Sequence, residues 1–380
     1  MSAPDPRIRR AAHRWVGPLV GAAAVSALAW TAAQVLAPPA ELAWTPEMQS
    51  AAARMRSAMA AVRKHREAAG PPIDAALDPN HTGLIGPEYA ELFTTLGDLE
   101  AKRTTTDPDV AALLVHLLGR AGVGEGDTVA VGASGSFPAL LVATLVAAEA
   151  LGARPVMILS LGASSYGATD PAFDLLALHQ LLVAAGVIRT PPAAVSVGGA
   201  RDVGGDFEPD VRERTLARIR ESGVPLVEEP DLARNVARRM EIYFGGAPGG
   251  SAGQRRPAAF VNVGGGDANI GVSPTVLELR PGLADSVPLP PAAQRGVLHA
   301  MAARGVPVIH LLNIRDLALR HGLPWDPVPL PEPGMTRLTR GGPERSPLLL
   351  AIAGAWLAAM VILAAAGVMI PERSKDPDPP

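Results

Sequence analysis

The sequence predicts an α/β domain built on a doubly wound, mostly parallel sheet and flanked by one N-terminal and one C-terminal transmembrane helix. Three observations lead to this fold class. Apolar strands alternate with helices between residues 104 and 324, which is the pattern of repeated βαβ units. The strands are continuously apolar, as expected for a parallel sheet covered on both faces. An uncharged apolar run also lies near each end of the chain.

The two apolar runs comprise residues 16–37 and 348–370. Each is long enough to cross about 30 Å of hydrocarbon at roughly 1.5 Å per helical residue. Arginines cluster just before the first run, so the positive-inside rule keeps residues 1–15 in the cytoplasm and places residues 38–347 outside. We therefore expect a two-pass protein of the cell (inner) membrane with an extracytoplasmic central domain. A cleaved signal peptide at the first run is the alternative.

Domain boundaries follow from these runs and from shifts in composition. The predicted segments are a basic cytoplasmic tail (1–15), a transmembrane helix (16–37), a helical connector (38–103), the α/β domain (104–324), a Pro/Gly-rich linker (325–347), a transmembrane helix (348–370) and a polar tail (371–380).

The connector begins with a predicted helix over residues 45–69. Thr45 is a suitable N-cap, because a threonine oxygen can accept a hydrogen bond from a free first-turn N–H group. Met48, Met55 and Met59 recur at helical spacing on one face. Such a methionine stripe indicates packing against a core.

The central domain divides into alternating apolar and amphipathic segments. Strands are predicted at 128–131, 154–160, 193–197, 226–228, 260–263 and 306–312, and helices at 106–118, from 136 onward, at 170–185, 208–222, 231–244 and 314–321, with a flexible loop at 245–254.

The segment Asp127 to Gly152 is the centre of this arrangement. It reads as a buried strand, a Gly/Ser turn over residues 132–136 and an apolar helix. We expect the helix to begin at Ser136, which would act as its cap, with Pro138 in the first turn, where proline costs little. Strand, turn and helix make the first half of a βαβ unit.

Small-residue turns follow several of the predicted strands, at 132–136, 161–167, 198–199 and 262–271. If the strands are parallel neighbours, these turns share the carboxyl edge of the sheet, where backbone N–H groups and helix N-termini make an anion-binding crevice. The alternative is that the turns need glycine for positive φ and serine for capping in any case. The predicted ligand-binding residues are Gly132, Gly135, Ser136, Ser164, Ser165, Gly264, Gly265 and Gly266.

Several function classes are excluded or disfavoured. No lysine lies between residues 104 and 324, and neither GxxxxGK[ST] nor GxGxxG spacing is present, which argues against a P-loop mechanism. The chain has no cysteine and no HExxH motif, so we expect no metal site and no cofactor. The net charge of −3 is not accompanied by a concentrated basic face, so no nucleic-acid partner is expected.

Residues 132–136, GASGS, come within one residue of the G-x-S-x-G nucleophile elbow. Ser134 occupies the nucleophile position of that pattern. His310, at the end of a predicted strand, is the candidate base, and Asp267 or Asp316 could orient it. A histidine at a strand end is more often a hydrogen-bonded structural residue, so both interpretations stay open.

Several segments of the central domain resemble the poly-γ-glutamate system protein family: GSFPAL (135–140), GASSYGATDP (162–171), RMEIY (239–243), FVNVGGG (260–266) and GVPVIHLLNIRDLALRHGLP (305–324). The resemblance rests on whole segments and on the layout with two anchors. It implies a membrane protein that accompanies the poly-γ-glutamate synthase in making, exporting or retaining the polymer. It assigns no catalytic residue.

Two hypotheses of different class follow. The first is a non-catalytic component of the polymer system, which binds a carboxylate or phosphate ligand, including the anionic polymer, and contacts synthase subunits in the membrane. The second is an extracytoplasmic serine hydrolase or transpeptidase that acts on the polymer through Ser134 and His310. A third, weaker interpretation is a cytoplasmic nucleotide or phosphate sensor.

Overall fold

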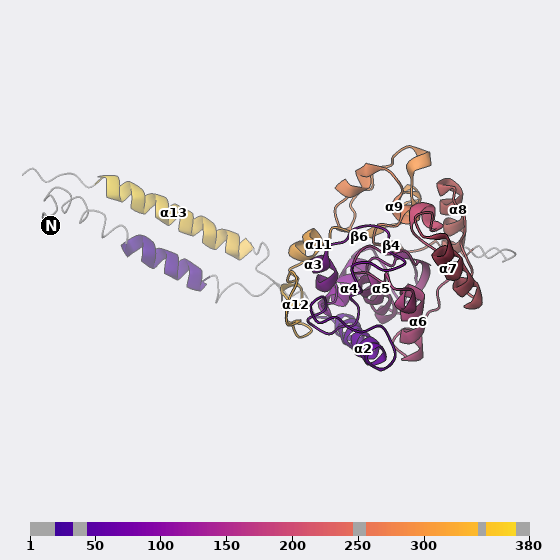
Figure 1. Ribbon diagram of the computed structural model, residues 1–380. Coiled ribbons are helices and arrows are strands. Elements are labelled where there is room, and N and C mark those ends of the chain that lie inside the picture. The colour runs from indigo at the N-terminus through magenta and orange to yellow at the C-terminus, as the bar shows by residue number, and fades with distance from the viewer. Residues whose placement is uncertain (1–19, 33–43, 246–255, 341–346, 370–380) are drawn as a thin grey trace, which may run out of the picture. The chain divides into compact units, whose positions relative to one another are not determined.

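A computed structural model describes residues 20–32, 44–245, 256–340 and 347–369. The chain divides into two compact units, one made of residues 43–339 and the other of the two terminal segments. The larger unit contains the sheet (Figure 1). Residues 43–103, predicted as a connector, therefore belong to the same compact unit as the α/β domain.

The six-stranded sheet has the order β3-β2-β1-β4-β6-β5. Its strands are β1 (Thr128–Ser134), β2 (Arg154–Ser160), β3 (Ala194–Ser196), β4 (Ala259–Val263), β5 (Gly282–Leu283) and β6 (Val308–Leu311). All neighbouring pairs are parallel except β5 with β6. The mostly parallel α/β sheet that the sequence predicts is thus confirmed.

The chain reverses its direction across the sheet between β1 and β4. It proceeds from β1 through β2 to β3 on one side and then crosses to β4 and β6 on the other. In open α/β sheets, ligands bind outside the carboxyl ends of the strands at such a switch point.

Alternate residues of each strand enter two different cores. Val129 and Val131 of β1 belong to one core, whereas Ala130 belongs to the other. Likewise Val261 of β4 lies in the first core and Phe260 in the second. Burial on both faces explains why the strands are continuously apolar.

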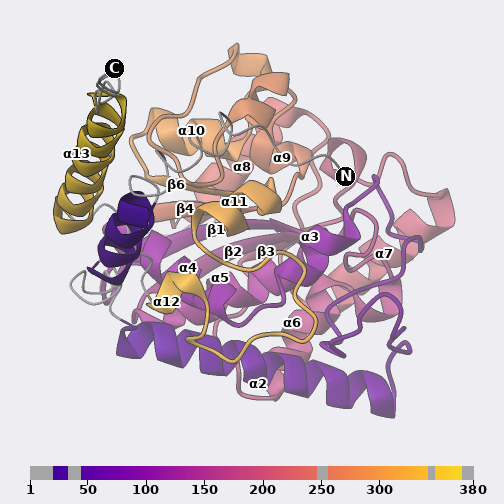
Figure 2. The same ribbon diagram turned by 90° about the vertical axis from the view of Figure 1, so that its left-hand side faces the viewer.

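The first core is covered by α2 (Pro46–Ala68), α4 (Asp109–Arg120), α5 (Pro138–Ala150) and α6 (Leu175–Ala184). The second is covered by α8 (Leu232–Tyr243) and α10 (Val297–Ala303). Figure 2 shows α2, α4 and α5 on one side of the strands and α8, α9 (Asp267–Ile270) and α10 on the other. The remaining helices of this unit are α3 (Leu99–Thr104), α7 (Pro209–Glu221), α11 (Ile314–Arg320) and α12 (Arg337–Arg340).

Helix α2 confirms the predicted cap and the predicted packing face. The Met48 N–H donates to Thr45 Oγ1 at 3.2 Å. Met48, Met55 and Met59 are buried in the first core. The helix packs on α4 and α5.

Three local predictions need correction. Strand β1 extends to Ser134, so Gly132 to Ser134, predicted as a turn, are strand residues. Helix α5 begins at Pro138, with Phe137 as its N-cap, and Ser136 lies outside it. Residues 226–228 contribute only an isolated bridge between Leu226 and Val195. The loop predicted at 245–254 lies, apart from Gly245, outside the described residues.

The smaller unit contains a helix over residues 20–32 and α13 (Pro347–Met369). The Trp356 indole N–H donates to Ser26 Oγ at 2.9 Å and links the two. Counting only fully described residues, no helix combines the length and the apolar character needed to cross a membrane. The predicted spans 16–37 and 348–370 both extend beyond the fully described residues, since the side chains of α13 are described only from 350 to 362.

Candidate functional site

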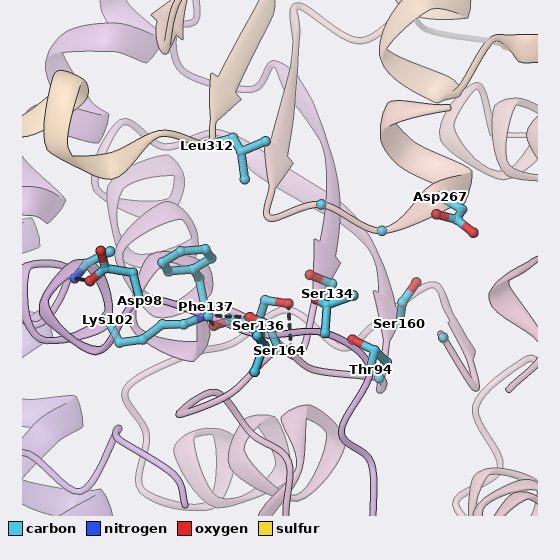
Figure 3. A pocket seen from close by; sticks show the side chains of 18 of the residues that line it. Thr94, Asp98, Lys102, Ser134, Ser136, Phe137, Ser160, Ser164, Asp267 and Leu312 are labelled. Carbon is cyan, nitrogen blue, oxygen red and sulfur yellow. Dashed lines mark hydrogen bonds between the residues drawn. The ribbon is translucent and has the colours of Figure 1, made fainter. Parts of the chain in front are cut away.

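A pocket of about 550 Å³ lies at the carboxyl edge of the sheet, at the switch point between β1 and β4. Each of the four predicted small-residue turns contributes to its lining (Figure 3). The turn residues that line it are Ser134, Ser136, Gly162, Ser164, Gly198, Gly199, Gly265 and Gly266. The volume falls within the range of roughly 300–1,000 Å³ that is typical of small-molecule sites.

Serines stand in register at the carboxyl ends of the first three strands. Ser134 of β1 pairs with Ser160 of β2, which pairs with Ser196 of β3. The Oγ atoms of Ser160 and Ser196 are 2.9 Å apart, and both hydroxyl groups donate to Asp202 Oδ1. Ser134 is only 3% exposed, and its Oγ has no hydrogen-bond partner among the described residues. A buried unpaired hydroxyl is costly, and Ser134 is the member of this row whose hydroxyl lacks a protein partner among the described residues.

Helix α5 begins next to this pocket, because Ser136 and the N-cap Phe137 line it. Its N-cap, Phe137, supplies no side-chain hydrogen bond. Ser136, predicted as the cap, instead accepts a hydrogen bond from the Ser164 N–H at 3.1 Å. A helix N-terminus without a side-chain cap carries free N–H donors and a partial positive charge, both of which favour an anion.

Lys102 of α3 brings a cation to this helix end. Its Nζ donates to the Ser136 carbonyl and, at 2.7 Å, to Ser164 Oγ. It lies 3.8 Å from the centre of the Phe137 ring (Figure 3). Two positive groups, the ammonium and the start of α5, are therefore held side by side in one pocket.

Burial lowers the pKa of Lys102 from its ordinary value to about 7, and the nearby Asp98 carboxylate opposes this shift. The lysine side chain is only 2% exposed, so loss of hydration outweighs the attraction of Asp98. A bound anion would favour the charged form and raise the pKa again.

Acidic side chains line another part of the pocket. Asp206 Oδ1 accepts from the Ala200 N–H at 2.8 Å, and Asp267 Oδ2 accepts from the Arg201 N–H at 3.2 Å. Burial raises the pKa of Asp267; the Arg201 N–H opposes this rise, and the Asp202 and Asp206 carboxylates add to it. Asp202 itself pairs with Arg239 at 2.6 Å.

The predicted ligand-binding residues divide into two groups. Ser136, Ser164, Gly265 and Gly266 line the pocket, whereas Gly132, Gly135, Ser165 and Gly264 do not. The three glycines of the second group allow close packing. A Cβ at Gly132 would lie 2.5 Å from Asn269 Oδ1, one at Gly135 would lie 2.5 Å from the Leu161 carbonyl oxygen, and one at Gly264 would lie 2.4 Å from Ser134 Oγ.

The three predicted catalytic residues are not joined by hydrogen bonds. Ser134 and Asp267 line the pocket and His310 does not. His310 is buried in β6, and its Nδ1 is 3.1 Å from Asn262 Nδ2. Burial, with a smaller contribution from His299, lowers the pKa of His310 to about 4. Asp316, the other candidate to orient His310, pairs with Arg320 on α11. His310 thus stands as a hydrogen-bonded strand residue, and the triad stays a prediction.

The fully described residues contain no group of histidine, aspartate and glutamate side chains that could hold a metal ion. The residues that line the pocket carry hydroxyl, amide, ammonium, guanidinium, carboxylate and indole groups.

Sequence reasoning missed two parts of the site. Residues 94–98 and Lys102 close one side of the pocket, and residues 312–315 with Trp325 close another. Thr94 is held there by its N–H, which donates to the Ala163 carbonyl at 2.9 Å. One signal was present in the sequence: Lys102 is one of only three lysines in the chain.

Comparison with known proteins adds little. No family model matches the chain, and no curated protein matches it. One solved structure, titled "Complex structure of VinN with 3-methylaspartate", is similar over 52% of this chain and 41% of its own, with 13% identity and a TM-score of 0.13. The chain spans less than half of that protein.

Proposed function

We propose that the α/β domain binds a carboxylate- or phosphate-bearing ligand in the switch-point pocket. The observation that carries this proposal is the buried, unpartnered Ser134 Oγ in a pocket that Lys102 and Phe137, the N-cap of α5, also line. An anion there would accept hydrogen bonds from the hydroxyl and from backbone N–H groups and would offset two adjacent positive charges.

The segment resemblance extends this proposal to a biological role. The chain would be a membrane-anchored component of a poly-γ-glutamate biosynthesis or export system, and its domain would bind the α-carboxylates of the polymer outside the cell. Residues 16–37 and 348–370 would be the anchors, and synthase subunits in the membrane would be the partners.

A serine hydrolase or transpeptidase is the alternative. It requires a base in contact with Ser134, and no described side chain forms a hydrogen bond with Ser134 Oγ. A binding role needs only the hydroxyl, the helix N-terminus and the lysine.

Replacing Lys102 tests the anion site. We expect Lys102→Met to weaken binding of γ-glutamate oligomers by roughly 10- to 100-fold, because one charge-assisted hydrogen bond contributes about 1.5–3 kcal/mol. Isothermal titration calorimetry on the purified full chain in detergent would measure the change, with inorganic phosphate as a second probe.

Lys64→Met is the matched control, because Lys64 lies exposed on α2 outside the pocket lining. It should bind as the wild type does. The proposal is wrong if the wild type binds neither probe at millimolar concentration or if both lysine variants bind equally well.

A further inference from the structure

The pocket carries opposite charges in different places. Lys102 and Arg315 line one part together with Asp98, which caps α3 by accepting from the Ala101 N–H, and the helices α3 and α11 contact each other. Asp206 and Asp267 line another part, where they hold the backbone of neighbouring residues Ala200 and Arg201. Figure 3 shows Lys102 and Asp267 on opposite sides of the pocket. A ligand that fills the pocket meets a cationic side and an anionic side.

The anionic side holds more negative charge than its protein partners neutralise. Asp202 pairs with Arg239, but within the described part of the chain neither Asp206 nor Asp267 forms a salt bridge, and both accept hydrogen bonds from backbone N–H groups. Asp267 is partly buried beside both other carboxylates. A cationic group of a ligand would relieve this repulsion.

Ser134 connects the two sides. Its unpartnered Oγ lies between Lys102 and Asp267 in Figure 3. The turn that leads to Asp267 lies directly over it, since a Cβ at Gly266 would be 3.7 Å from Ser134 Cβ. A ligand that reaches from the lysine to the aspartates would therefore pass the one buried hydroxyl that lacks a partner in this row of serines.

We propose that the ligand is zwitterionic: its carboxylate binds at Lys102 and the N-terminus of α5, and its ammonium group binds at Asp267 and Asp206. This chemistry belongs to an acidic amino acid or to an acidic peptide with a free amino terminus, in which a carboxylate other than the one beside the ammonium group can reach the lysine. In a γ-linked glutamate chain only the amino-terminal residue keeps its ammonium group. The inference rests on the proposed function, and it assigns the pocket to the amino end of such a chain or to its monomer.

The test compares a dipeptide with and without its ammonium group, and the same dipeptide with its monomer. The probes are γ-L-glutamyl-L-glutamate, its N-acetyl derivative and free L-glutamate, titrated into the full chain in detergent. We expect N-acetylation to weaken binding at least tenfold. Tighter binding of the dipeptide than of glutamate would support the chain end as the source of the zwitterion, and equal binding would support the free amino acid.

Asp267→Asn locates the ammonium group, because asparagine keeps an oxygen for the Arg201 N–H and removes the charge. It should weaken binding of the free dipeptide about tenfold and leave binding of the N-acetyl derivative unchanged. Asp285→Asn, in an exposed loop outside the pocket lining, is the control and should alter neither. If Asp267→Asn fails to fold by circular dichroism, Asp206→Asn gives the same comparison.

The two proposals fail in different ways. If the acetylated and free dipeptides bind equally and Asp267→Asn affects both alike, the zwitterion is wrong while the anion site stands. If neither dipeptide nor phosphate binds, or if Lys102→Met binds as Lys64→Met does, the anion site itself is wrong.

Discussion

Lys102 shows how a single residue can define the character of a pocket. Its ammonium has only neutral hydrogen-bond partners, a carbonyl and a hydroxyl, and an aromatic ring beside it. Asp98 attracts it, but Asp98 also caps α3 by accepting from the Ala101 N–H at 2.9 Å. The ammonium is therefore incompletely compensated, which is the state expected of a residue that awaits a charged ligand.

The pKa of Lys102, lowered to about 7, makes ligand affinity depend on pH. Only the charged lysine attracts an anion, so affinity should fall roughly tenfold per pH unit as pH rises above 7. Calorimetric titration of the N-acetyl dipeptide, which has no ammonium group of its own to titrate, at pH 6, 7, 8 and 9 measures this slope. Lys102→Met should lose most of this pH dependence. If the affinity of the wild type stayed the same from pH 6 to pH 9, the role given to Lys102 would be contradicted.

The same shift has an opposite consequence for stability. The folded pKa of about 7 lies below the ordinary lysine value, so the unfolded chain binds more protons between about pH 7 and 10. Stability contributed at this residue therefore rises with pH across that window and is lowest below pH 7. Denaturant unfolding of wild type and Lys102→Met at pH 7 and pH 9.5 would reveal the difference.

At the scale of elements, the connection from β1 to α5 depends on close packing against the turn after β2. The Gly135 N–H donates to the Ser160 carbonyl at 2.9 Å and to the Gly162 carbonyl at 3.0 Å. These bonds hold Ser136 and Ser164 together beside Lys102. The turn was predicted to contribute to an anion-binding crevice, whereas Gly135 packs on the turn after β2 and does not line the pocket.

Gly135→Ala should push the β1–α5 connection away from the turn after β2. The added Cβ would lie 2.5 Å from the Leu161 carbonyl oxygen and 2.8 Å from Ala163 Cβ, positions fixed by backbone. We expect a loss of about 1–3 kcal/mol in the free energy of unfolding, measured by urea denaturation.

Gly119→Ala in α4 is the control for the same chemical change. A Cβ there would meet no atom within 4 Å, so alanine should stabilise the helix by about 0.5–1 kcal/mol. Equal effects of the two substitutions would show that Gly135 does not need its close approach.

At the scale of the whole domain, a buried polar network joins four elements behind the pocket. Arg239 of α8 is fully buried and donates to Asp202 Oδ2 at 2.6 Å, to Ser160 Oγ at 3.0 Å and to Ser196 Oγ at 2.9 Å. Asp202 is held at a φ of 63° in the segment after β3. Asn235 donates to the same carboxylate at 3.1 Å. The network holds Ser160 and Asp202 in place where they line the pocket.

Arg239→Met should be severely destabilising because it leaves the Asp202 carboxylate buried and unpaired. We expect a loss of about 3–5 kcal/mol in the free energy of unfolding, measured by chemical denaturation. Addition of Asp202→Asn should restore part of the loss.

Arg238→Met on the same helix provides the comparison. Arg238 is 40% exposed and pairs with the exposed Glu241 at 3.1 Å, so its replacement should change the free energy of unfolding by less than about 1 kcal/mol. A similar loss for both arginines would contradict the role given to Arg239.

Local patterns in the sequence were enough to predict the class of fold and the edge of the sheet that carries the pocket. Burial of parallel strands on both faces leaves continuous apolar runs, and β2 begins and ends where its run does, at Arg154 and Ser160. The Thr45 cap could also be predicted from the sequence, because capping is an interaction between residues close in sequence. Small-residue turns at strand ends indicated the carboxyl edge, since parallel strands bring those ends together.

The side chains that line the pocket could be identified only from the packing of segments that lie far apart in the sequence. Lys102 reaches the start of α5 across 34 residues, and Arg239 reaches Asp202 across 37. Neighbouring glycines that cannot be told apart in the sequence have different positions in the structure: Gly265 lines the pocket, whereas Gly264 packs on Ser134. Local patterns encode local conformation and burial, whereas the partners of a buried charge depend on how distant segments cross, and no local pattern records that crossing.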